Sequence, residues 1–230
     1  FEKGRHVLSV NSDGKNQLVT SGVDHIKFWT LTGRSLSGVG GAFGKVNGTQ
    51  QTFLCSKFVD SSTVVTGTQE GSIYVWSVNP GAAELIHIVK KNSAHYVGCD
   101  GPNEVFDICV KPKTADQEKS GTFHVLSGGG GRKAILWRFE KKGQGVTETK
   151  LHECVMPEHE CCITDPSECV RAVSIVNEKL IIGTSFNSLY YCTLDSASED
   201  PKLGEIGVLC SGHVEGEHKE GRINCVCCCP

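Results

Sequence analysis

Long apolar runs are missing from this sequence of 230 residues. No stretch of 18 apolar residues occurs anywhere, and no basic segment followed by an apolar one opens the chain. A membrane-spanning helix needs about 20 predominantly apolar residues, and a secretory leader needs an apolar centre of about 7–15. We therefore expect a soluble intracellular chain that has no membrane partner.

A strong charge of either sign is also missing. The formal net charge is -3, so charge alone favours neither a nucleic acid nor an anionic membrane as a partner. The sum hides an asymmetry, because residues 90–150 carry 11 Lys and Arg against 7 Asp and Glu, whereas residues 151–220 carry 4 against 13. We expect a basic region and an acidic region on the surface, and no nucleic-acid partner.

The sequence has none of the short patterns that mark common catalytic or nucleotide sites. It has no GxSxG elbow, no HExxH and no GxxxxGK[ST] loop. The four-glycine run at residues 128–131 precedes Arg132 and Lys133, where we expect a turn between strands, and glycine permits positive φ there. The sequence therefore predicts a protein that is not an enzyme and has no bound cofactor.

Cysteine, in contrast, is plentiful. The chain has 13 cysteines, but it is long enough to bury a core without disulfides, so we expect reduced thiols. One short segment raises zinc as an alternative, because it contains His152, Cys154, His159, Cys161 and Cys162. Zinc fingers separate their ligand pairs by a structured element, which this compact segment lacks, so we favour loop thiols and no metal. The alternating cysteines of residues 225–229 are expected to be small buried side chains of a strand.

A repeated unit runs along the chain, at residues 18–31, 64–78, 125–139 and 180–194. Each unit is a short β-branched run, a polar turn containing glycine, and a second alternating run that ends on Trp29, Trp76, Trp137 or, in the fourth unit, Cys192. Alternation of this kind predicts antiparallel strands, and the spacing is close to the roughly 40–50 residues of a propeller blade. In the second unit we expect strands at residues 53–58, 63–66, 72–76 and 84–89. The polar stretch 113–121 is expected to be a loop insertion in the third.

We predict an all-β fold, a β-propeller of the WD-repeat type that forms one domain over residues 1–230. It should have about four complete four-stranded blades and the start of a fifth. The expected blades are residues 5–50, 51–97, 104–153 and 167–213, with the further blade starting at 218–230. Propellers usually have about four to eight blades, so we expect a piece of a larger propeller. The repeated tryptophans are expected to pack between blades.

The phrases of the repeat occur in an order that resembles one family. HIKFWTLTGRSLS at residues 25–37, VVTGTQEGSIYVW at 64–76, VLSGGGGRKAILW at 125–137 and VRAVSIVNEKLIIGTSFNSLYY at 170–191 are similar to the propeller region of the echinoderm microtubule-associated protein-like (EML) family. In WD repeats the tryptophan is usually followed by Asp, but none of these tryptophans is. We therefore expect no Asp-centred hydrogen-bond network.

The resemblance implies a non-catalytic protein that binds αβ-tubulin, influences microtubule organisation and is found in the cytoplasm on the microtubule cytoskeleton. The loops between second and third strands should gather on one face of a propeller and differ from blade to blade, which suits recognition of a protein. The expected binding residues on these loops are Asp24, His25, Gln69, Glu70, Arg132, Lys133 and Asn187.

Tubulin is acidic, and a basic region comprising Arg132, Lys133, Lys141 and Lys142 would attract it. Two alternatives stay open at this point: a general scaffold for another protein complex, ciliary or signalling, and, as a third function, a propeller enzyme with a metal in its channel. The sequence predicts no particular oligomeric state.

Overall fold

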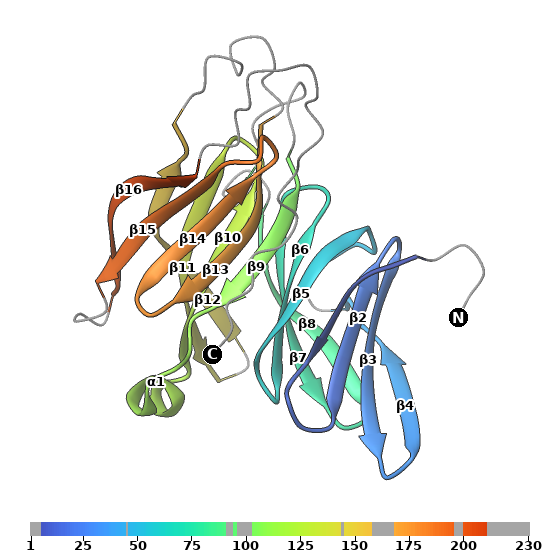
Figure 1. Ribbon diagram of the computed structural model, residues 1–230. Helices are drawn as coiled ribbons and strands as arrows, with labels where there is room; N and C mark the ends of the chain where they lie inside the picture. The colour runs from blue at the N-terminus through green and yellow to red at the C-terminus, as the bar shows by residue number, and fades with distance from the viewer. Residues whose placement is uncertain are drawn as a thin grey trace.

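The computed structural model describes residues 6–44, 46–90, 94–95, 103–143, 145–157, 168–195 and 200–210. The described chain consists almost wholly of strands, arranged as four sheets (Figure 1). The first sheet contains β1 (Val7–Ser12), β2 (Gln17–Gly22), β3 (His25–Thr32) and β4 (Ser35–Gly40). The second contains β5 (Phe53–Asp60), β6 (Thr63–Thr68), β7 (Ile73–Asn79) and β8 (Ala82–Val89).

The third sheet contains β9 (Val105–Val110), β10 (Thr122–Gly129), β11 (Lys133–Lys142) and β12 (Gly145–Val155). The fourth contains β13 (Val170–Val176), β14 (Lys179–Thr184), β15 (Leu189–Asp195) and β16 (Lys202–Cys210). Each sheet is an antiparallel meander of four consecutive strands, as the sequence repeat predicts. The described residues therefore form a WD-type β-propeller segment of four complete blades, while residues 218–230, the predicted start of another blade, lie outside them.

The first strands of the blades, β1, β5, β9 and β13, are neighbours in space. Their side chains link each blade to the next: the Asn11 Oδ1 atom accepts from the Phe58 N–H at 2.9 Å, and an Asp107 carboxylate oxygen accepts from the Val173 N–H at 3.0 Å. The last strands lie at the outer rim. This radial order is the one that buries the two faces of each sheet against its neighbours.

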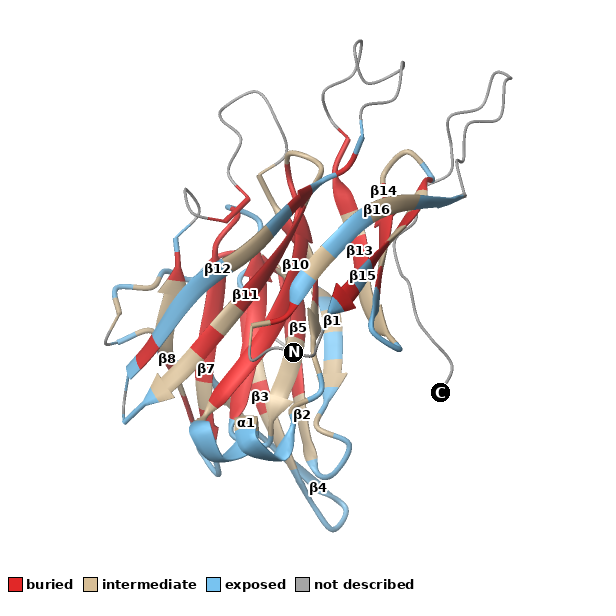
Figure 2. Cartoon of the chain, turned by 90° about the vertical axis from the view of Figure 1, so that its left-hand side faces the viewer, coloured by how far each residue is buried: buried red, intermediate tan, exposed pale blue. Residues whose placement is uncertain are grey.

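The first two blade interfaces are each filled by the tryptophan of the later blade. Trp76 is 0% exposed and packs against Phe28 and Phe43 of the first blade, with ring centroids 5.6 and 5.2 Å apart. Trp137 is 1% exposed and lies in one cluster with Val65 and Val75 of the second blade. The buried band across the middle of the strands is visible in Figure 2. The tryptophans at these two interfaces therefore have the packing role that repetition predicts.

The third-blade insertion differs from the predicted loop, because residues Ala115–Ser120 form a short helix, α1. Thr114 and Gln117 form a capping box, in which the Thr114 hydroxyl accepts from the Gln117 N–H and the Gln117 side chain accepts from the Thr114 N–H. Gly121 ends the helix with a φ of 72°. No residue of α1 is buried, so its local caps, rather than apolar periodicity, explain why it is helical.

Candidate protein-binding face and its scaffold

The turns between second and third strands lie at one end of every blade. Each turn is anchored in the same way, because its first N–H donates to the carbonyl of the residue just before the first strand of its blade. The four bonds are Val23 to His6 at 2.9 Å, Gln69 to Thr52 at 3.0 Å, Gly130 to Glu104 at 3.0 Å and Ser185 to Cys169 at 3.0 Å. A rigid repeated scaffold thus presents four turns of different sequence.

The residues at the tips of these turns adopt left-handed backbone conformations. Asp24, Arg132 and Asn187 have φ of 45°, 57° and 59°, and in the second blade Gly71 has a φ of 86°. Asp and Asn tolerate this region better than most other side chains, and Gly does so without steric cost. The tight turns leave Asp24, Gln69, Glu70 and Asn187 exposed, as a recognition surface requires.

Three predicted binding residues are less exposed than the turn tips. His25 is only 8% exposed, and its Nε2 atom lies 2.9 Å from the Thr20 hydroxyl, so it supports the turn from within the blade. Lys133 is half-buried and forms an ion pair of 3.0 Å with Glu153 on the neighbouring strand β12. Arg132 is also half-buried. The exposed tips are therefore the better candidates for direct contact.

The predicted basic region is wrong as a single patch. Arg132 and Lys133 lie at the start of β11, whereas Lys141 and Lys142 lie at its other end. A strand rises about 3.3 Å per residue, so the two pairs are roughly 30 Å apart, well beyond the screening length of about 8 Å at physiological ionic strength. Lys142 also pairs with Glu140 at 2.7 Å. Although these residues are close in sequence, the extended strand β11 places the two pairs at opposite ends of the blade.

A hydroxyl holds each tryptophan of the repeat, and the sequence reasoning missed it. The indole Nε1–H donates to Thr20 from Trp29 at 2.9 Å, to Thr66 from Trp76 at 3.0 Å and to Ser127 from Trp137 at 2.9 Å. Each hydroxyl is on the second strand, nine or ten residues before its tryptophan. That fixed spacing is the signal by which the sequence could have revealed the network.

In the third blade this network continues to a buried histidine. The His95 Nε2 atom lies 2.8 Å from the Ser127 hydroxyl, and His95 is 0% exposed. Burial lowers the pKa of His95 to about 4, so its ring is neutral at physiological pH. The described bonds of this network therefore join Trp137, Ser127 and His95.

The glycine run is explained by close packing. A Cβ atom on Gly128 would lie 2.5 Å from the Val170 side chain, and one on Gly129 would lie 2.2 Å from the Glu104 carbonyl oxygen. Gly128 therefore packs closely against the fourth blade, and Gly129 packs against the residue that precedes β9 in its own blade. Gly131 supplies a φ of 66° in the turn itself.

Two of the five possible zinc ligands, His152 and Cys154, lie on β12. The other three, His159, Cys161 and Cys162, fall outside the described residues. Cys154 is 8% exposed, and burial raises the pKa of its thiol to about 12, which disfavours the thiolate that zinc requires. Within the described ranges, no group of three or more His, Cys, Asp or Glu side chains is placed to hold a metal ion. In those ranges, no helix is long and apolar enough to span a membrane either.

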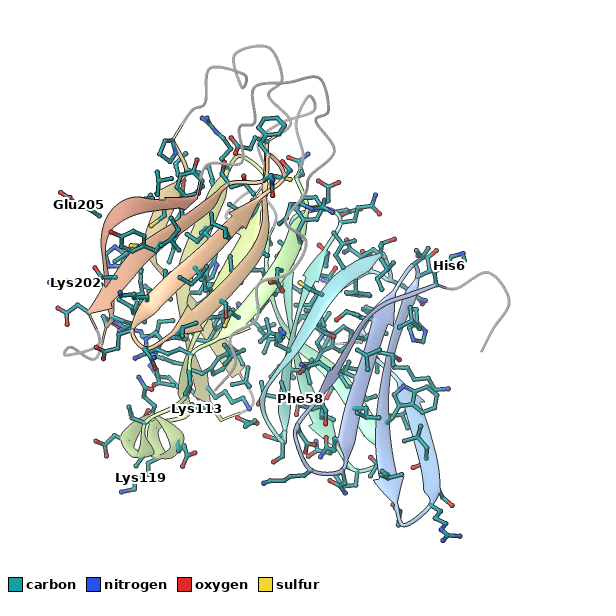
Figure 3. The ribbon with its side chains drawn as sticks, in the orientation of Figure 1. His6, Phe58, Lys113, Lys119, Lys202 and Glu205 are labelled. Atoms are coloured by element: carbon teal, nitrogen blue, oxygen red, sulfur yellow. The ribbon has the colours of Figure 1, made fainter. Side chains whose placement is uncertain are left out.

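The opposite end of the blades has a cavity of about 540 Å³ between the first three blades. Phe58, Asp60 and Lys113 are among its lining residues, and Figure 3 labels Phe58 and Lys113. Asp60 accepts hydrogen bonds from Ser62 and Thr63 and pairs with Lys113 at 2.5 Å. Burial opposes ionisation of Asp60, but these bonds outweigh it and hold the pKa of the carboxyl well below its usual value. The ion pair between Asp60 and Lys113 thus joins the second and third blades.

Comparison with known proteins gives several relatives of one kind, although no family model matches the chain. Human echinoderm microtubule-associated protein-like 2 is 32% identical over 86% of this chain and 24% of its own length. The human proteins named -like 3 and -like 4 are 30% and 32% identical, over 80% and 75% of this chain and 19% and 15% of theirs. The chain thus spans about a quarter or less of these relatives.

The alignment with human echinoderm microtubule-associated protein-like 2 covers 86% of this chain, so it includes most of the four blades that the structure describes. The ordered phrases of the repeat, the four antiparallel meanders and these alignments point to one conclusion. The chain belongs to the echinoderm microtubule-associated protein-like (EML) family and forms part of its WD-type propeller region.

Proposed function

We propose that this chain is a non-catalytic protein-binding segment of a microtubule-associated protein, and that it binds αβ-tubulin on the cytoplasmic microtubule cytoskeleton. The relatives are named as microtubule-associated proteins, which supports the choice of partner. The observation that carries a binding role is the set of four anchored turns, whose exposed tips differ in chemistry from blade to blade. Varied tips on a repeated scaffold suit one irregular protein surface.

The proposed contact face is the end of the blades that carries Asp24, Gln69, Glu70, Arg132 and Asn187. Lys133 contributes to it as the neighbour of Arg132, although its charge is balanced by Glu153. Because the basic residues of β11 are divided between two ends, attraction of acidic tubulin by this face rests on few charges. We therefore expect contacts at the turn tips to matter more than long-range steering.

The test compares two variants with equal changes in net charge. Arg132→Gln with Lys133→Gln alters the turn face, and Lys119→Gln with Lys142→Gln alters the opposite end, where Figure 3 labels Lys119 on α1. Sedimentation with polymerised tubulin should show weaker binding of the first variant, by about threefold or more, and unchanged binding of the second. The difference should shrink with added salt, because charge interactions are screened.

Circular dichroism of both variants shows whether the blades remain folded. Equal weakening by both variants would mean that overall charge, and not this face, governs binding. Absence of any sedimentation of the folded parent chain with microtubules would refute tubulin binding by this segment. In that case a scaffold for another protein becomes the favoured function, since it uses the same turn face.

A further inference from the structure

A chemically labile pair of residues lies in the linker between the first two blades, residues 41–52. Asn47–Gly48 is the only pair in the sequence in which asparagine precedes glycine. Asparagine is among the thermolabile residues of proteins, and it loses its amide most easily before glycine, which has no Cβ atom to shield the backbone nitrogen. The pair is therefore a candidate site of chemical modification.

The structure leaves both reacting groups of this pair available. Asn47 is exposed in a turn and has a φ of 52°, a left-handed conformation that asparagine tolerates well. Within the described ranges of the chain, neither the Asn47 side chain nor the Gly48 N–H forms a hydrogen bond. Asn11 is different, because its Oδ1 atom accepts from the Phe58 N–H at 2.9 Å. The Asn47 amide is therefore not held away from the Gly48 nitrogen.

The reaction that these two groups allow needs only water. The Gly48 nitrogen loses its proton to solvent and attacks the Asn47 Cγ atom, and the side-chain nitrogen leaves as ammonia, which produces a cyclic imide. Water then opens the imide at either of its two carbonyl carbons. One opening gives aspartate, and the other gives isoaspartate, in which the main chain runs through the former side chain. The sum is the uptake of water and the release of ammonia, with no oxidant or reductant.

The linker is fixed to the second blade on both sides of the pair. Before the pair, the Ala42 N–H donates to the Ala83 carbonyl and the Ala42 carbonyl accepts from the Leu85 N–H, each at 2.8 Å. After the pair, the Thr49 N–H donates to the Tyr74 hydroxyl at 3.3 Å. Isoaspartate adds a backbone atom between these fixed points. The contacts on at least one side of the pair must then shift.

Contacts of the linker with both blades lie close to the pair. Gly48 packs against the second blade, since a Cβ atom on it would lie 2.1 Å from the Leu85 side chain. The Gln50 side chain donates to the Asp24 carbonyl in the turn of the first blade at 2.5 Å. A longer backbone at Asn47 therefore disturbs the junction from both sides.

We infer that Asn47 is a deamidation site of the folded chain, with water as the second reactant, and that isoaspartate formed there loosens the junction of the first two blades. The reaction needs no enzyme, so it changes the chain slowly and in one direction as the chain ages. It depends on the linker alone and is independent of the partner proposed for the turn face.

The test is incubation of the folded 230-residue chain near neutral pH, followed by peptide mapping with mass spectrometry that separates aspartate from isoaspartate. Asn177 and Asn187 are internal controls, because both are exposed and have φ of 43° and 59°. Asn47 should convert at least about tenfold faster than either, because the residues that follow the controls carry a Cβ atom. Equal rates at all three, or conversion of Asn47 only after unfolding in urea, would overturn the inference.

The Asn47→Gly variant tests the effect on the junction, because glycine tolerates the positive φ and has no amide to lose. Once most Asn47 has converted, the melting temperature of the parent should be lower by at least about 2 °C, whereas that of Asn47→Gly should stay constant through the same incubation. Asn47→Asp should lose less than the converted parent, because it has the new charge without the extra backbone atom. An equal fall in the parent and Asn47→Gly, or no fall in the converted parent, would refute the loosening.

Discussion

Trp76 and Trp29 hold the same position in the repeat but different positions in the packing, so they make a matched pair for mutation. Trp76 is 0% exposed between two blades, whereas Trp29 is half-buried on the first blade, with the Lys27 amine 4.5 Å from its ring centroid. Truncation of a buried Trp costs about 3–5 kcal/mol. Trp76→Ala also leaves the buried Thr66 hydroxyl without its indole partner, at about 1 kcal/mol or more.

We expect Trp76→Ala to lower the free energy of unfolding by about 4–6 kcal/mol, a large share of the 5–15 kcal/mol typical of a domain. Trp29→Ala should cost about 1–2 kcal/mol, because less buried surface is lost. Trp76→Phe should fall between them, since it keeps contacts with Phe28 and Phe43 but loses the hydrogen bond. Urea unfolding followed by circular dichroism measures all three.

The packing argument fails if Trp76→Ala and Trp29→Ala cost the same. It also fails if Trp76→Ala is as stable as the parent and loses only binding, because that result would make Trp76 a ligand platform. Recovery of little soluble Trp76→Ala, with normal yields of Trp29→Ala and Trp76→Phe, would agree with the expected order.

Two further predictions concern the ion pair between blades and the cysteines. Asp60→Asn should destabilise the chain by about 2 kcal/mol at pH 7, because the Lys113 side chain, 12% exposed, loses its carboxylate partner. The folded-state pKa of Asp60 is lowered, so its contribution is present above the ordinary value of 3.8 and is lost as the pH falls below it. The parent and Asp60→Asn should therefore differ in urea midpoint at pH 7, and the difference should begin to shrink below pH 3.8 and shrink further as the pH falls towards the lowered folded-state pKa. A difference that stays constant down to about pH 2 would contradict the assignment. The described cysteines Cys55, Cys109, Cys154, Cys169 and Cys192 are free thiols, so reductant should leave the melting temperature unchanged, and a fall of more than about 4 °C would indicate a structural disulfide.

The sequence by itself determined the repeat, and with it the four blades and most strand positions. Each unit contains its own alternating strands and its own turn, and these are local signals that a short window of residues carries. The strands predicted in the second unit, at residues 53–58, 63–66, 72–76 and 84–89, overlap β5, β6, β7 and β8. The same repetition predicted that Trp76 and Trp137 pack between blades, as they do in the structure.

Tertiary structure decided what each repeated position contacts. Asp24 and His25 are neighbours in the turn of the first blade, yet Asp24 is exposed, whereas His25 is buried and contacts Thr20. Arg132 and Lys142 are close in sequence, yet an extended strand separates them to opposite ends of a blade. The contacts of Trp76 with Phe28 and Phe43 likewise depend on how two blades pack against each other, which the local pattern of neither blade contains.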